Sequence, residues 1–79
     1  MKKHFEDTWE EAEELVHSSS LALHVFNIKK LIDEFEKTQD AEIFGKILFE
    51  LSGISKDNKI NVDAALRHCI DDFKIDNYG

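Results

Sequence analysis

Four glutamates near the start of the chain form its densest group of side chains that could bind a metal ion. Glu10, Glu11, Glu13 and Glu14 lie within five consecutive residues, with no lysine among them. Glu10 and Glu14 are one turn apart on a helix, where like charges repel by roughly 0.2–0.5 kcal/mol. Magnesium prefers hard oxygen ligands and would offset this repulsion. The alternative, which is the usual behaviour of charge runs, is a solvated acidic face near a helix N-terminus.

Three segments of the chain together form a pattern that is typical of a known family. They are Glu10-Glu11-x-x-Glu14 directly after Trp9, then Glu42-Ile-Phe-Gly-Lys-Ile-Leu-Phe49, and then Ala65-Leu66-Arg67 followed by Phe73. The pattern resembles that of the MazG-like all-α nucleoside triphosphate pyrophosphohydrolases, over about residues 40–75 and more loosely over 9–15. In that family, carboxylates from two helices hold magnesium ions against the triphosphate. Under an enzymatic alternative, the resemblance therefore implies a magnesium site formed by Glu10, Glu11, Glu14 and Glu42.

The chain departs from this family at the positions that carry its chemistry. The second family motif supplies a Glu and an Asp three residues apart, and these positions hold Ile43 and Lys46. A protonated lysine cannot ligate a metal ion. The Asn and Lys that serve the substrate fall on Ile70 and Asp72. The resemblance therefore implies a relative with a degraded catalytic set, which is more consistent with binding than with catalysis.

The histidines and the single cysteine give no further catalytic motif. His4, His17, His24 and His68 lack a metal-binding spacing, because a run of serines interrupts the helix between the middle two. We therefore predict four surface histidines. Cys69 lies on an apolar helical stripe, which predicts a buried structural thiol. A single cysteine cannot form a disulfide within the chain, which fits a reducing compartment.

The composition bounds the class of protein. The chain has 79 residues, enough for one domain over 1–79. Its net charge of −7 argues against direct nucleic-acid binding, because phosphate contacts need clustered Lys and Arg. The sequence has neither the apolar run of a signal peptide nor the roughly 18 consecutive apolar residues of a membrane span. We therefore expect a cytoplasmic protein that does not bind a membrane.

Apolar residues recur at helical spacing along most of the chain, which contains no proline. The spacing predicts helices over residues 5–17, 21–37, 41–52 and 62–74. A capping box of Thr8 and Glu11 would begin the regular part of the first helix at Trp9. Gly53 would end the third helix, and Asn61 would cap the fourth. Each of the four helices has an apolar stripe that must pack against another element. We therefore predict an all-α fold, a compact bundle of about four helices.

Apolar and acidic side chains together suggest how such a bundle would act. A chain this small and this apolar can keep part of its surface for a partner. We predict an interaction module that binds a protein partner or a second copy of itself, with Trp9, Glu13, Phe26 and Phe35 as binding residues. The alternatives are the magnesium-dependent pyrophosphohydrolase and an acidic inhibitor, of the immunity or anti-defence kind, that covers a basic site.

Overall fold

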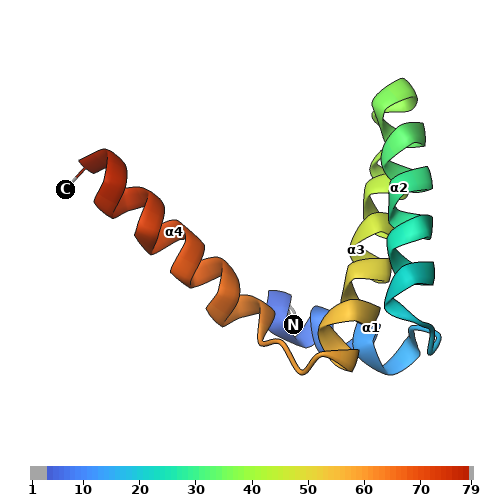
Figure 1. Cartoon of the computed structure of the whole chain (residues 1–79), viewed down its shortest axis with the longest axis horizontal. Coiled ribbons are helices and arrows are strands. Elements are labelled where there is room, and N and C mark those ends of the chain that lie inside the picture. Colours follow the sequence, from blue (N-terminus) through green and yellow to red (C-terminus); the bar gives the residue numbers. More distant parts are fainter. Residues whose placement is uncertain (1–3, 79) are drawn as a thin grey trace.

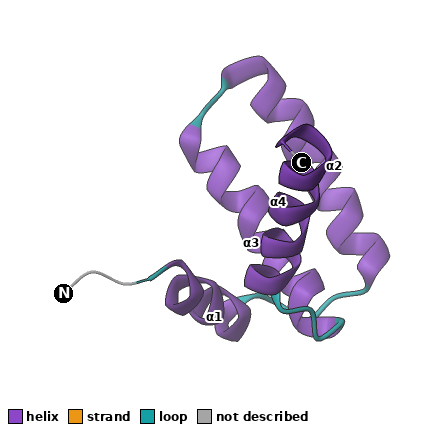
Figure 2. Cartoon of the chain, turned by 90° about the vertical axis from the view of Figure 1, so that its left-hand side faces the viewer, coloured by secondary structure: helices purple, strands orange, loops and turns teal. Residues whose placement is uncertain are grey.

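The chain folds into helices joined by short connections. The computed structural model describes residues 4–78, and within this range it contains four α-helices and no strand. The helices, drawn in Figure 1, are α1 (Phe5–Leu15), α2 (Leu21–Thr38), α3 (Ala41–Asp57) and α4 (Val62–Tyr78). Figure 2 shows the loops between them. The structure confirms the predicted all-α fold with four helices.

Polar side chains cap three of the helices. Ser20, Asp40 and Asn61 each accept a hydrogen bond from a backbone N–H two or three residues further along, at 3.2, 2.9 and 3.0 Å. Each bond satisfies one of the donors that a helix start leaves without a partner. Gln39 ends α2 in the left-handed conformation with a φ of 51°. Residues 39 and 40 therefore form a two-residue turn between α2 and α3.

The expected capping box at Thr8 and the expected end of the third helix at Gly53 are both wrong. Helix α1 begins at Phe5, so Thr8 lies inside it, and its hydroxyl bonds to the carbonyl of His4 at 3.4 Å instead of capping the helix. Helix α3 continues through Gly53 to Asp57. Gly53 does not have a positive φ, and the left-handed residue after α3 is Lys59. This glycine serves the packing of α3, as described below, and does not end the helix.

Helices α2 and α3 form an antiparallel hairpin, and α1 crosses the base of α3 (Figure 1). The most buried residues lie where the end of α1, the start of α2 and the last turns of α3 meet. They are Val16, His24, Ser52, Gly53 and Ser55. Val16 is the one buried hydrophobic side chain among the described residues. The core of a single chain is therefore small and unusually polar.

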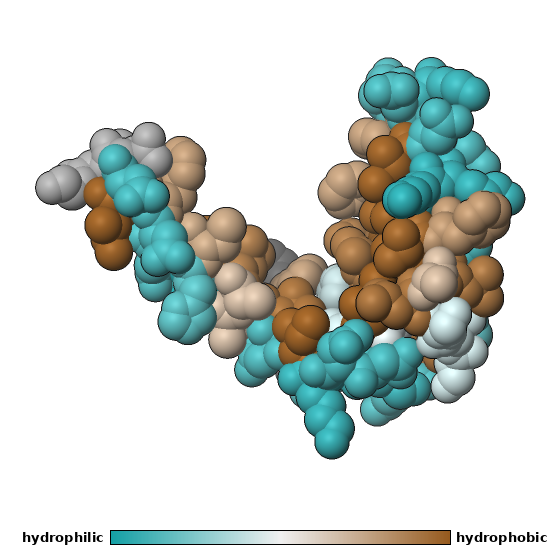
Figure 3. Space-filling view, in the orientation of Figure 1, coloured by the Kyte–Doolittle hydropathy of each residue, from teal (hydrophilic) through white to brown (hydrophobic). Residues whose placement is uncertain are grey.

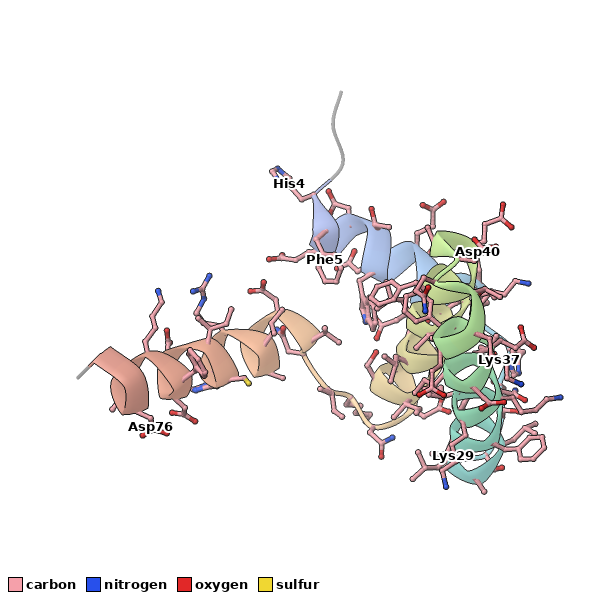
Figure 4. All side chains as sticks on the ribbon, turned by 90° about the horizontal axis from the view of Figure 1, so that it is seen from above. His4, Phe5, Lys29, Lys37, Asp40 and Asp76 are labelled. Atoms are coloured by element: carbon pink, nitrogen blue, oxygen red, sulfur yellow. The ribbon has the colours of Figure 1, made fainter. Side chains whose placement is uncertain are left out.

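Helix α4 extends away from the other three helices. Figure 4 shows it, with Asp76 near its end, on the opposite side of the molecule from the part of the hairpin that carries Lys29 and Lys37. The radius of gyration is 14.4 Å, whereas a compact domain of this length has about 11–12 Å. The packed part of the bundle is therefore formed by α1, α2 and α3. Within the described residues, no helix combines the length and the apolar character needed to cross a membrane.

Candidate functional site

The acidic residues of α1 do not meet Glu42 of α3. Glu10, Glu11 and Glu14 are exposed on α1, which contacts α3 near Ser55. Glu42 is exposed in the first turn of α3. Thirteen residues of helix separate Glu42 from Ser55, a rise of about 20 Å. Within one chain the four predicted magnesium ligands therefore do not converge on one cavity.

Three carboxylates of α1, of which only Glu10 is a predicted magnesium ligand, instead border a groove beside the α3–α4 connection. The groove has a volume of about 370 Å³, and its lining is mostly acidic and apolar. Its charged lining residues are Glu6, Glu10, Glu13, Lys59 and Asp63. A single lysine faces four carboxylates here, so the groove is strongly acidic. Such a surface suits a basic partner better than a triphosphate.

Two of the predicted binding residues, Trp9 and Glu13, hold α1 against α3. The indole N–H of Trp9 donates to Ser55 Oγ at 3.0 Å. The hydroxyl of Ser55 lies 2.8 Å from Glu13 Oε2 and 3.0 Å from the Ser52 carbonyl, so it can donate to either acceptor. Because Ser55 is 5% exposed, these bonds are shielded from water. Trp9 and Glu13 therefore have a role inside the chain.

The other two predicted binding residues, Phe26 and Phe35, do not share a surface. They are nine positions apart on α2, which places them about 180° apart around the helix. Phe35 packs against Phe44 of α3, with ring centroids 5.6 Å apart. Phe26 is 57% exposed, with the ammonium of Lys30 lying 5.6 Å from its ring centroid. No single partner surface on one chain contains both phenylalanines.

A broad apolar surface follows one side of the hairpin. The hairpin face, as we call it, consists of Leu21, Val25, Ile28 and Ile32 of α2 with Phe44, Ile47, Leu48 and Leu51 of α3. Leu21, Ile32 and Phe44 are each at least half exposed. Figure 3 shows apolar side chains along the side of the hairpin that faces α4. The hairpin face is therefore as apolar as a protein core, but its side chains remain partly exposed to solvent.

Helix α4 carries a second uncovered apolar surface. The α4 stripe consists of Val62, Ala65, Leu66, Cys69, Ile70 and Phe73. Leu66 is 54% exposed and Phe73 is 61% exposed. Cys69 is a free, exposed thiol. The prediction of a buried cysteine is therefore wrong for the single chain, because α4 has left the side of the bundle that would cover it.

A third feature, a cluster of two histidines and a glutamate, has no counterpart in the sequence prediction. The ring nitrogen Nδ1 of His24 lies 2.9 Å from Glu50 Oε1, and Nε2 of His17 lies 3.2 Å from Glu50 Oε2. His24 is fully buried, so the prediction of four surface histidines is wrong at this residue. A signal was present, because His24, Ile28 and Leu31 follow the i, i+4, i+7 spacing of a buried helix face.

The cluster perturbs the acidity of Glu50. Partial burial by itself would raise the pKa of this carboxyl. Hydrogen bonds from His24, His17 and Asn27, together with the charge of His17, outweigh burial and lower the pKa of Glu50 below its ordinary value. Asn27 Nδ2 donates to Glu50 Oε1 at 3.3 Å. Glu50 is therefore held as an anion between two imidazole rings.

No protein-family model, curated protein or solved structure matches the chain. The resemblance to the MazG-like pyrophosphohydrolases stays a prediction from the sequence.

Proposed function

We propose that the chain is a small acidic interaction module that acts by binding protein, and that its first partner is a second copy of itself. The observation that carries this proposal is the pair of uncovered apolar surfaces, the hairpin face and the α4 stripe. Among the described residues, twelve large hydrophobic side chains are at least 39% exposed, whereas Val16 is the one that is buried. Exposed apolar surface on this scale marks an interaction site.

The two surfaces fit one another in length. Helix α4 has 17 residues, and α2 and α3 have 18 and 17, so all three are about 25–27 Å long. If the α4 stripe of each copy lies on the hairpin face of the other copy, the two copies form a dimer with two-fold symmetry. Both surfaces are then covered in both copies. Such an exchange is isologous and closed, and it leaves neither of these two surfaces open for further growth.

The energy scale favours a reversible pair. Six side chains on these surfaces are at least 39% exposed in each copy, namely Leu21, Ile32, Phe44, Leu51, Leu66 and Phe73. Covering them at roughly 1 kcal/mol apiece gives two copies a gain on the order of 10 kcal/mol. Association costs about 4–15 kcal/mol. We therefore expect a pair whose population depends on concentration, not a permanent dimer.

Sedimentation velocity over a range of protein concentrations tests this proposal. The test variant is Leu66→Glu, which places a charge on the α4 stripe. Its matched control is Ile75→Glu on the same helix, because nine positions place Ile75 about 180° from Leu66 at 68% exposure. We expect Leu66→Glu to shift the chain to monomer and Ile75→Glu to leave the pair intact. A wild-type monomer at all concentrations, or equal behaviour of the two variants, would refute self-association through α4.

A further inference from the structure

Three potential metal ligands from three separate segments meet at the base of the hairpin. His17 follows α1, His24 is the fourth residue of α2, and Glu50 lies in the middle of α3. One ligand atom from each of these residues lies within 4.8 Å of the other two. In the part of the chain that the structure describes, they are the one group of three or more such side chains this close together.

The protonation of His24 points to a missing partner. A carboxylate only accepts hydrogen bonds, so His24 Nδ1 must carry the hydrogen that bonds to Glu50 Oε1. The other ring nitrogen, Nε2, is buried and has no hydrogen-bond partner. The nearest acidic atom to it is Asp57 Oδ2, at 4.0 Å. A fully buried imidazole nitrogen without a hydrogen-bond partner destabilises the folded state, so its presence calls for an explanation.

A metal ion bound to Nδ1 would resolve this cost. Coordination requires Nδ1 to be unprotonated, which moves the ring hydrogen to Nε2. The Nε2–H group would then lie 4.0 Å from Asp57 Oδ2, and a short movement of that exposed side chain would complete a hydrogen bond. Histidines that bind metals commonly donate their second ring N–H to a carboxylate in this way. Asp57 therefore stands where such a supporting group is needed.

We propose that His17, His24 and Glu50 form a binding site for one divalent transition-metal ion of the Zn²⁺ type. Two imidazole nitrogens with one carboxylate match zinc better than magnesium, which prefers oxygen ligands. The ligand contacts of 2.9 and 3.2 Å are close to the separation of about 3.3 Å between ligands at the corners of a zinc tetrahedron. A small expansion of the cluster therefore makes room for the ion.

The surrounding structure holds the site in place and gives access to it. The Ser20 cap fixes the start of α2, and Asn27 fixes one oxygen of Glu50. Glu50 also lines an open groove of about 290 Å³ between α2 and α3, together with Lys30 and Lys46. Three protein ligands leave a fourth position for water or an anion from this groove. All three ligands belong to one chain, so the site is independent of self-association.

Titration of the chelator-treated protein with Zn²⁺, in competition with a chromophoric zinc indicator, tests the site. We expect one zinc ion per chain, with no competition from a hundredfold excess of Mg²⁺. His17→Asn and Glu50→Gln should each weaken zinc binding at least tenfold. The control is His68→Asn, since His68 is exposed on α4, the helix that extends away from the hairpin. The side chain of His17 is 48% exposed, so its variant should keep the helical circular dichroism of the wild type.

Each result decides the proposal. One-to-one binding that depends on His17 and Glu50, but not on His68, supports the site. Absence of one-to-one binding, or equal affinity of wild type and His17→Asn, overturns it and leaves a hydrogen-bonded cluster with a purely structural role. Nitrogen-15 spectra of the imidazole rings give a second readout. Zinc should convert His24 from the Nδ1–H form to the Nε2–H form, and an unchanged His24 tautomer would contradict the proposed ligand.

Discussion

The imidazole ring of His24 on α2 lies directly against the backbone of Gly53 on α3. A Cβ atom added to Gly53 would stand 2.5 Å from Cε1 and 2.8 Å from Nε2 of this ring. No side chain fits in that space, and the fully buried ring has little room to move. The contact explains why a glycine occurs inside α3, where it costs about 1 kcal/mol relative to alanine.

Substitution of this glycine should destabilise the fold. We expect Gly53→Ala to lower the free energy of unfolding by about 1–3 kcal/mol, because it overpacks the site of His24. The matched control is Gly45→Ala in the same helix, where an added Cβ meets nothing within 4 Å. That change should stabilise the protein by about 0.4–1 kcal/mol. Urea unfolding of chelator-treated protein at one low concentration measures both. A Gly53→Ala variant as stable as the wild type would show that the ring of His24 does not rest on α3.

Loss of the Ser55 hydroxyl should loosen α1. Ser55→Ala removes the acceptor of the Trp9 indole N–H and a donor to Glu13. We expect a loss of about 1–3 kcal/mol in the free energy of unfolding, because partly buried polar groups lose their partners. Trp9 is the single tryptophan, so its fluorescence reports on α1 and should shift to longer wavelength. Ser18→Ala, at an exposed loop position, is the control. An unchanged emission spectrum in Ser55→Ala would argue that α1 does not depend on this bond.

Acid should weaken the base of the hairpin through Glu50. Because folding lowers the pKa of this carboxyl from 4.5, its contribution to stability is present above that pH. As the pH falls through and below 4.5, the unfolded chain binds a proton more readily than the folded chain, and stability is lost. Glu50→Gln cannot titrate, so the difference in stability between wild type and variant should shrink with falling pH. Urea midpoints of metal-free protein between pH 3 and pH 7 measure this difference, and a constant difference would contradict the lowered pKa.

Two complementary variants can establish which surfaces meet in the proposed pair. Ile32→Glu places a charge on the hairpin face, and Leu66→Glu places a charge on the α4 stripe. Each variant alone should therefore be monomeric. In a mixture, the intact stripe of the first variant can lie on the intact face of the second. Sedimentation velocity should therefore detect more pairs in the mixture than in either variant alone. If two hairpin faces meet instead, Leu66→Glu would still pair by itself.

A control on α2 separates the hairpin face from general apolar exposure. Leu23 is nine positions from Ile32, about 180° around the helix, and is 45% exposed, compared with 52% for Ile32. We expect Leu23→Glu to pair like the wild type. A monomeric Leu23→Glu variant would place the interface on the opposite side of α2.

The sequence by itself determined the helices and most of their starts. The signals for these helices are local: periodic apolar residues, the absence of proline, and the caps at Ser20, Asp40 and Asn61. Hydrogen bonds between residues close in sequence are enough to form helices from such signals. These local signals did not predict the end of α3. A glycine ends a helix when it takes a positive φ, but at Gly53 a ring 29 residues away in sequence decided its role.

Only the tertiary structure decided which side chains meet. The resemblance grouped Glu42 with Glu10, Glu11 and Glu14, but the length of α3 keeps it away from them. The hairpin instead folds His24 and Glu50 together, and the serine-rich loop turns His17 back toward them. Convergence depends on helix packing and loop geometry, which residue spacing along the chain does not contain. The direction of α4 could not be predicted either. An apolar stripe indicates that a helix packs against another apolar surface, but it does not indicate whether that surface belongs to the same chain or to a second copy.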